Sequence, residues 1–209
     1  LDRAAERGKI ELIRDFAYPL PLIVIAEMLG VPIEDRDVFK KWSDELAALL
    51  DPFLLPARIP EVRQAFDELA FYFRRVFAER RREPRDDLVS SLVRVEEAGG
   101  VLSETELLSV TALLLGAGHE TTTSLIANGV IALLRDPEER RRLRDDPELA
   151  ASAVEELLRY DSPVQLTDRL AVADCELGGH RIRSGQVVWV LLGAANRDPE
   201  VFTEPERVD

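Results

Sequence analysis

The sequence predicts a mainly α-helical protein with a small β-sheet near its carboxyl end. Apolar residues recur at three- and four-residue spacing in the amino-terminal half, as at Val62, Phe66, Leu69, Phe73 and Val76, and this is the period of an amphipathic helix. After residue 164, short runs rich in valine alternate with glycine turns, which is typical of strands. A chain of 209 residues with 46% hydrophobic content can bury a core. We find no repeat or linker-like stretch, so one domain over 1–209 is expected.

Glycine and proline mark where the expected helices of the first half begin and end. Glycine readily adopts the left-handed conformation that ends a helix, and proline fits the first turn of the next one. Helices are therefore expected over 1–7, 21–29, 32–50 and 86–97, the last one ending at Gly99-Gly100, in addition to the helix that carries Val62 to Val76. Residues 9–14 are a candidate strand, and the proline-rich residues 51–60 are expected to form a loop.

The longest expected helix covers residues 103–135. Ser103 and Glu106 have the spacing of a capping box, and apolar residues then continue almost unbroken to Leu134. In the middle of this helix, the run from Leu113 to Ser124 contains two glycines and three consecutive threonines. These residues lower helix propensity by roughly 2 kcal/mol or more. Such a conflict between local preference and overall pattern is typical of a functional site.

This run combines small residues with a carboxylic acid and hydroxyl groups. The stretch from Gly116 to Gly118 would let a flat, bulky group approach the backbone. Glu120 offers a proton source at the same place, and Thr121 offers a hydroxyl. The hydroxyls of Thr121 and Thr122 can also bond to carbonyls one turn earlier, which would open the helix locally.

Two other interpretations of this run remain open on the residues alone. The glycines could serve a close helix-helix crossing, with the threonines as packing residues. A zinc protease would need a second histidine four residues after His119, where the sequence has Thr123.

The run Ala117-Gly118-His119-Glu120-Thr121-Thr122 is similar to the oxygen-binding helix of the cytochrome P-450 haem-thiolate monooxygenases. The resemblance implies the cytochrome P-450 fold, of which this chain would be the truncated central part. It also implies haem b as cofactor, lying against Ala117 and Gly118. Glu120 and Thr121 would then be the catalytic residues that handle protons.

A second motif of the family is similar to Glu156 and Arg159, at the end of a helix expected over 147–160. The spacing alone is not specific, because five other pairs share it: Glu11/Arg14, Glu79/Arg82, Glu138/Arg141, Glu139/Arg142 and Glu204/Arg207. Only Glu156 and Arg159 follow the long helix at the family's interval, so the resemblance implies that this pair forms a buried brace for the haem-ligand loop. Arg207 would be its third member, although Val208 stands where the family usually has phenylalanine. Glu155 could compete for Arg159 at four-residue spacing.

The small sheet is expected over 164–192, with a buried strand from Gln186 to Leu192. The resemblance implies that Arg169 contacts a haem propionate, and the alternative is a surface arginine at a strand edge. The residues just before Arg169 would line the substrate pocket. They are Val164, Gln165, Leu166 and Thr167.

The chain contains a single cysteine, Cys175, which fits a reducing cytoplasm and excludes an internal disulfide. It is flanked by Asp174 and Glu176, whose negative charges oppose the thiolate that binds iron. The resemblance implies that the axial cysteine of the haem iron lies in a glycine-rich loop shortly after Arg207, outside this chain, so no iron ligand is expected within it. The early helices of the family are expected to be missing as well.

Composition limits the partners. A net charge of −13 argues against a nucleic acid, because phosphates are bound by positive surfaces. No apolar run is a convincing membrane span, and the amino terminus lacks a signal pattern. We expect a cytoplasmic protein without nucleic-acid or membrane partners.

The resemblance implies a soluble, bacterial-type monooxygenase that inserts one oxygen atom of O2 into a small apolar substrate. Electrons would come from a ferredoxin- or flavodoxin-type donor. Helices within 20–85 would form the lid of the substrate pocket. The 209 residues alone are expected to be inactive. The alternative function is a non-catalytic, all-helical interaction domain, in which the same residues are packing and surface pairs.

Overall fold

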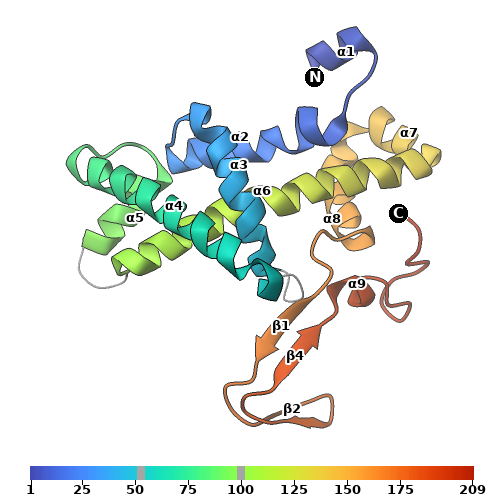
Figure 1. The fold of residues 1–209 in the computed structure, drawn as a ribbon. Coiled ribbons are helices and arrows are strands. Elements are labelled where there is room, and N and C mark those ends of the chain that lie inside the picture. Colours follow the sequence, from blue (N-terminus) through green and yellow to red (C-terminus); the bar gives the residue numbers. More distant parts are fainter. Residues whose placement is uncertain (51–54, 98–101) are drawn as a thin grey trace. The chain divides into compact units, whose positions relative to one another are not determined.

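The computed structural model describes residues 1–50, 55–97 and 102–209 (Figure 1). The chain forms two compact units, Leu1–Thr123 and Ser124–Asp209. The boundary between them falls within the longest helix, α6 (Glu104–Arg135). The expectation of one domain over 1–209 stays a prediction.

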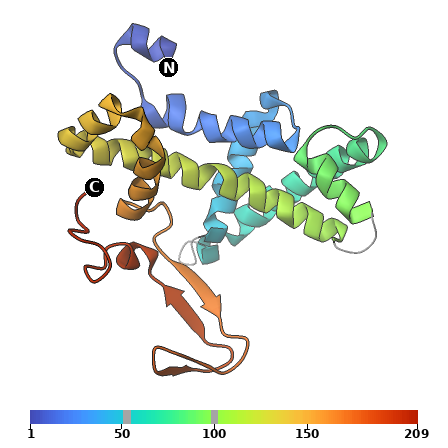
Figure 2. The same cartoon turned by 180° about the vertical axis from the view of Figure 1, so that it is seen from behind.

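The first unit is helical throughout its regular elements. Glycines with positive φ follow two of the helices, Gly8 at 65° after α1 and Gly30 at 70° after α2. The elements before α6 are α1 (Asp2–Arg7), the π-helix η1 (Ile13–Ala17), α2 (Pro19–Leu29), η2 (Ile33–Asp35), α3 (Arg36–Leu46), η3 (Ala47–Leu50), α4 (Leu55–Arg82) and α5 (Leu88–Glu97). α3 crosses α6, in front of it in Figure 1 and behind it in Figure 2.

Three local expectations need comment. The candidate strand over 9–14 is wrong, because residues 9–11 have no regular structure and η1 begins at Ile13. Of the two alternating residues, Ile10 is exposed and Leu12 is only half-buried, so the alternation buries no face. The loop expected over 51–60 falls partly outside the described residues, and from Leu55 onward the chain is helical. The helix end expected at Gly99-Gly100 lies outside the described residues.

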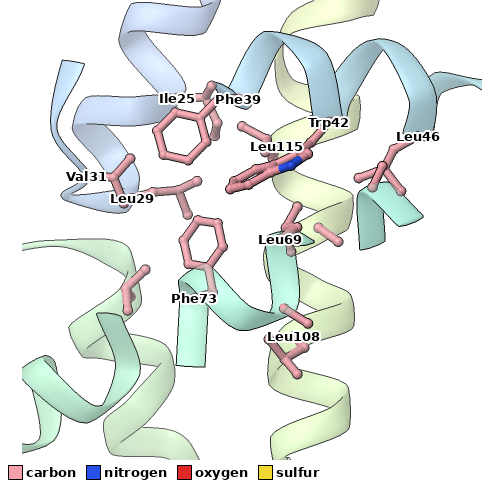
Figure 3. Close-up of a cluster of buried hydrophobic side chains, with 14 of the residues drawn as sticks. Ile25, Leu29, Val31, Phe39, Trp42, Leu46, Leu69, Phe73, Leu108 and Leu115 are labelled. Carbon is pink, nitrogen blue, oxygen red and sulfur yellow. The ribbon is translucent and has the colours of Figure 1, made fainter. Parts of the chain in front are cut away.

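The core of the first unit lies between α2, α3, α4, α5 and α6. Figure 3 shows Phe39 of α3 and Phe73 of α4, whose stacked rings have centroids 6.3 Å apart. Leu29 of α2 and Leu115 of α6 are fully buried in the same cluster. Each such side chain contributes about 1.5–3 kcal/mol on burial. This packing holds the middle of α6 against three other helices.

The amino terminus of α6 is capped as expected. The Ser103 N–H donates to Glu106 Oε2 at 2.7 Å, and the Glu106 N–H donates to Ser103 Oγ at 3.3 Å. The capping box is therefore confirmed, and it satisfies two backbone donors at the start of the helix.

A buried ion pair joins α2, α4 and α5. Arg80 Nε donates to Asp87 Oδ2 at 2.6 Å, and Arg80 Nη2 donates to the Gly30 carbonyl at 2.6 Å. The side chains of Arg80 and Asp87 are only 2% and 4% exposed. Burial by itself would raise the pKa of Asp87, but hydrogen bonds from Ser90 and Arg80 outweigh it and lower that pKa. A Cβ at Gly30 would lie 2.1 Å from Asp87 Oδ2, so this position requires glycine.

The second unit combines short helices with two antiparallel strand pairs. β1 (Thr167–Leu170) pairs with β4 (Val187–Val190), with Thr167 opposite Val190. β2 (Cys175–Leu177) pairs with β3 (His180–Ile182). The helices, besides the end of α6, are α7 (Pro137–Asp145), η4 (Pro147–Leu149), α8 (Ala150–Tyr160) and α9 (Leu192–Ala195).

The strand expected from Gln186 to Leu192 is shorter than predicted and is not buried. Val187 and Trp189 of β4 are 51% and 44% exposed. A two-stranded pair has no central strand, so apolar content alone does not place such a strand in a core. None of the helices within the described ranges is long and apolar enough to cross a membrane.

Replacing Arg80 by methionine should destabilise the protein strongly. Arg80→Met leaves Asp87 buried without its cation, so we expect the free energy of unfolding to fall by about 3–5 kcal/mol in denaturant titrations. Arg74→Met is the matched control, because its partner Glu104 and Arg74 itself are 50% and 58% exposed, and such a pair contributes about 1 kcal/mol or less. Equal losses in the two variants would contradict the assigned role of Arg80.

Candidate active site

A cavity of about 230 Å³ lies beside the middle of α6 in the first unit. Its α6 wall is one helical face made mostly of small or apolar residues, Ser109, Ala112, Leu113, Gly116 and Ala117, and the facing wall includes Leu46, Leu49 and Phe66. Leu113 and Leu49 are 61% and 53% exposed. Exposed leucines around an apolar hollow are typical of a site that binds an apolar molecule.

The two glycines of this stretch face different surroundings. No heavy atom lies within 4 Å of the place where a Gly116 Cβ would stand, so there is open space on that side of the helix. A Cβ on Gly118 would instead lie 3.2 Å from the Ile25 side chain of α2. Gly118 therefore approaches α2 closely, as the packing interpretation suggested, although the residue itself is exposed. Its expected place beside the cofactor stays a prediction. Gly116 and Ala117 are the residues that leave room for a flat group.

The three threonines also differ in what they contact. Thr121 Oγ1 donates to the Ala117 carbonyl at 3.1 Å, as expected, whereas Thr123 Oγ1 donates to the Ala17 carbonyl at 3.1 Å. Thr122 is exposed. The expected opening of the helix is not found, because α6 is α-helical from Glu104 to Arg135. A single hydroxyl bonded to a carbonyl one turn back is compatible with a regular helix.

His119 is fully buried between α3 and α2, and sequence reasoning gave it no role. Its Nδ1 lies 3.0 Å from Ser43 Oγ and 3.2 Å from the Leu115 carbonyl oxygen. The ring packs edge-on against Tyr18, with centroids 5.2 Å apart. Glu120 Oε2 lies 3.8 Å from His119 Nε2. No local spacing pattern could have revealed Ser43, which is 76 residues away.

In the second unit, Arg159 forms the centre of a hydrogen-bond network. Its Nε and Nη2 donate to the two carboxylate oxygens of Glu156 at 2.7 and 2.6 Å. The remaining donors reach three backbone carbonyls, those of Asn196 at 3.0 Å, Pro205 at 2.9 Å and Arg207 at 2.7 Å. One guanidinium thus ties the end of α8 to two later loop segments.

The electrostatics of this pair follow from its geometry. The hydrogen bond that Arg159 donates to the Glu156 carboxylate raises the pKa of Arg159. Burial alone would raise the pKa of Glu156, but hydrogen bonds from Arg159 and the Asp209 N–H outweigh it, so that pKa is lowered. The stability from a lowered carboxyl pKa is present at neutral pH and is lost as the pH falls through it. Glu155 is exposed and does not compete for Arg159.

Arg207 enters this network differently from the expectation. Its side chain is 65% exposed and pairs with Glu204 at 3.2 Å. Only its backbone carbonyl reaches Arg159. Sequence reasoning missed Arg197, which donates to the Tyr160 carbonyl at 2.7 Å and pairs with Glu206. A carbonyl contact leaves no trace in side-chain identity, so the resemblance that pointed to the Arg207 side chain could not indicate it.

The remaining predicted residues lie in and before β1. Arg169 is exposed, and its Nη1 donates to Thr167 Oγ1 at 3.2 Å and to the Asp168 carbonyl at 2.6 Å. Gln165 Nε2 donates to the Ser162 carbonyl at 2.6 Å. The segment Val164 to Thr167 belongs to the second unit, whereas the cavity beside α6 lies in the first. The role of Val164 to Thr167 in substrate binding stays a prediction.

Comparison with known proteins identifies the family. The family model described as Cytochrome P450 matches residues 37–148 and 148–209. The chain is 43% identical over 209 residues to the biotin biosynthesis cytochrome P450 of Bacillus subtilis, and 45% identical over 204 residues to the vitamin D(3) 25-hydroxylase of Pseudonocardia autotrophica. It therefore belongs to the cytochrome P450 family.

Solved structures agree with the fold. The crystal structure of P450BioI in complex with an acyl carrier protein ligated to hexadec-9Z-enoic acid matches with a TM-score of 0.87 and 41% identity, covering 100% of this chain and 54% of that one. The two curated relatives are covered to 53% and 49% of their own length, with 100% and 97% of this chain aligned. The chain spans about half the length of the curated relatives it matches.

Replacing Arg159 should loosen the segments that it ties together. In Arg159→Ala, Glu156 loses its cation and three carbonyls lose a donor, so we expect the free energy of unfolding to fall by about 3 kcal/mol. Hydrogen exchange should accelerate in residues 196–209. The control is Arg144→Ala, whose side chain is 72% exposed and pairs with the neighbouring Asp145, so it should cost about 0.5 kcal/mol. Equal stability and exchange in the two variants would contradict the network.

Proposed function

We propose that the protein containing this chain is a haem-dependent monooxygenase that inserts one atom of O2 into a small apolar substrate. The observation that carries the proposal is the hollow beside Gly116 and Ala117, because Thr121 and Glu120 follow one helical turn after these two residues. A reacting group held there would have a hydroxyl and a carboxylic acid at the end of its binding surface. Membership in the cytochrome P450 family supports this assignment.

Haem b is the cofactor of this family, and the described residues fit a planar group. The open space beside Gly116 and the exposed methyl of Ala117 allow close approach to the helix. Arg169 makes its two hydrogen bonds through Nη1, which leaves its other nitrogens for a propionate. When bound, haem supplies an iron that activates dioxygen. Cys175 is an exposed free thiol in β2, and we do not assign it as the iron ligand.

The proposed task of Thr121 and Glu120 is to deliver protons to this surface. The Thr121 hydroxyl donates to the Ala117 carbonyl at 3.1 Å, and rotation about χ1 would redirect that proton outward. Glu120 is 42% exposed, so its carboxylate can exchange protons with solvent. The acid would receive a proton from water and the hydroxyl would position one beside the substrate.

The apolar lining of the cavity supports an apolar substrate. One relative is named a vitamin D(3) 25-hydroxylase, and vitamin D(3) is a small apolar molecule. We propose a ferredoxin- or flavodoxin-type electron donor. We also propose a cytoplasmic location, because the exposed Cys175 is a free thiol, as expected in a reducing compartment. We also propose that the 209 residues alone are inactive. Glu156 and Arg159 would brace the segment that leads to the iron ligand.

The test of this function is the variant Thr121→Ala in the whole protein. We expect substrate binding to persist while reducing equivalents are diverted from product to hydrogen peroxide, because the variant lacks the hydroxyl that could rotate toward the substrate. Stability should rise slightly, since alanine is the better helix former by roughly half a kcal/mol. The measurement is product formed per reduced nicotinamide consumed, together with a thermal melt.

The matched control for this test is Thr122→Ala, which changes an exposed neighbouring threonine and should leave coupling unchanged. Glu120→Gln should slow turnover, because an amide cannot relay protons at neutral pH. If Thr121→Ala kept full coupling but melted at a lower temperature, its hydroxyl would be a packing group and the proposed role would be wrong.

A further inference from the structure

Three potential metal ligands lie together where α3 passes α6. They are Asp44 of α3 and the consecutive residues His119 and Glu120 of α6. One ligand atom from each residue lies within 4.8 Å of the other two, and all three belong to the first unit. Acidic side chains often gather on protein surfaces without binding an ion. The feature that distinguishes this cluster is its buried histidine.

The hydrogen bonds of His119 fix which of its nitrogens can bind a metal. Nδ1 lies 3.2 Å from the Leu115 carbonyl oxygen, which can only accept a hydrogen bond. This carbonyl favours the tautomer with the proton on Nδ1, because Ser43 Oγ, 3.0 Å from Nδ1, has the same carbonyl oxygen as an acceptor for its own hydroxyl at 3.5 Å. A backbone carbonyl holding the far nitrogen is the arrangement that orients metal-binding histidines. Nε2 is left with a free lone pair.

That lone pair is buried and has no hydrogen-bond partner among the described residues. The side chain of His119 is 0% exposed, and its Nε2 faces Glu120 Oε2 at 3.8 Å. Both atoms are acceptors, so their approach is repulsive unless something positive lies between them. The separation is too long for a direct hydrogen bond. It suits two ligands of one ion, because ligands at about 2.1 Å from a metal lie roughly 3–4 Å apart.

The surrounding charge also favours a cation. Asp44 and Glu120 bring two carboxylates, and Lys40 neutralises only part of this charge through its pair with Asp44 at 2.6 Å. Asp44 and Glu120 are 45% and 42% exposed, so an ion can enter from solvent. The widest ligand separation must shorten slightly on binding, which side chains of this exposure can do by rotation.

We propose that Asp44, His119 and Glu120 form a binding site for one divalent transition-metal ion of the Zn²⁺ class. One imidazole nitrogen with two carboxylates matches zinc and its neighbours, whereas magnesium and calcium prefer oxygen ligands alone. Water would complete the coordination on the exposed side. Bound metal would hold the carboxylate of Glu120, so the site would inhibit turnover; this consequence rests on the proposed function of Glu120.

The test is a calorimetric titration of zinc chloride into the chelator-treated whole protein. We expect one equivalent to bind with a dissociation constant below the millimolar range. Asp44→Asn should weaken binding at least tenfold, because it removes an anionic ligand on the surface without disturbing the buried histidine. Lys40→Gln should tighten binding several-fold, since it releases Asp44 and removes a competing positive charge.

His180→Ala is the control for binding at the other histidine of the chain, which is exposed in β3, and it should leave the affinity unchanged. The site is refuted if no zinc binds up to millimolar concentration, if Asp44→Asn binds as tightly as the unaltered protein, or if His180→Ala abolishes binding. Turnover is measured in parallel. Zinc that binds with the expected variant pattern but does not inhibit would support the site and refute the role of Glu120 in proton delivery.

Discussion

The middle of α6 has a different neighbour in almost every direction, and each residue there is constrained by what it faces. Leu115 fills the core, and Gly118 lies against Ile25 of α2. Gly116 faces open space beside the cavity. His119, one turn after Leu115, meets Ser43 of α3. A sequence that looks unsuitable for a helix is therefore suited to these neighbours, because packing against α2 to α4 compensates for its weak propensity.

The second unit is stabilised by a different kind of interaction. Few of its side chains are fully buried, and its carboxyl-terminal segments are held by charged hydrogen bonds to backbone oxygens. Arg159 supplies most of them, and Arg197 adds another at Tyr160. A guanidinium suits this task because its planar fork offers five donors in fixed directions. Lysine could not replace Arg159 without losing several of these bonds.

Local patterns in the sequence were informative wherever the partner lies within one helical turn. The capping box of Ser103 and Glu106, the Thr121 bond to Ala117 and the pair of Glu156 with Arg159 all belong to this group. Their spacing follows directly from helix geometry. The family resemblance added what spacing alone could not, by selecting one Glu-x-x-Arg pair from six.

Contacts across long sequence separations could not be predicted in the same way. The Arg80 bond to the Gly30 carbonyl spans 50 residues, and nothing in the local sequence distinguishes Arg80 from the arginines that follow it. Arg207 shows a related difficulty, since it takes part through a carbonyl that any residue would provide. The candidate strand over 9–14 failed because alternation indicates a strand only where one face is buried.

The two buried carboxylates with lowered pKa values, Asp87 and Glu156, have a shared consequence for handling the protein. Acidification protonates them and removes the stability that their ion pairs contribute in each unit. The same acidification reduces the net charge of −13 that keeps the molecules apart in solution. The net charge passes through zero at an isoelectric point of about 4.7, above the pKa values of both carboxylates, which are lowered from ordinary values of 3.8 and 4.5. Repulsion between molecules is therefore weakest while both ion pairs are still intact. The pairs are lost at lower pH, where the molecules carry a positive charge and repel one another again.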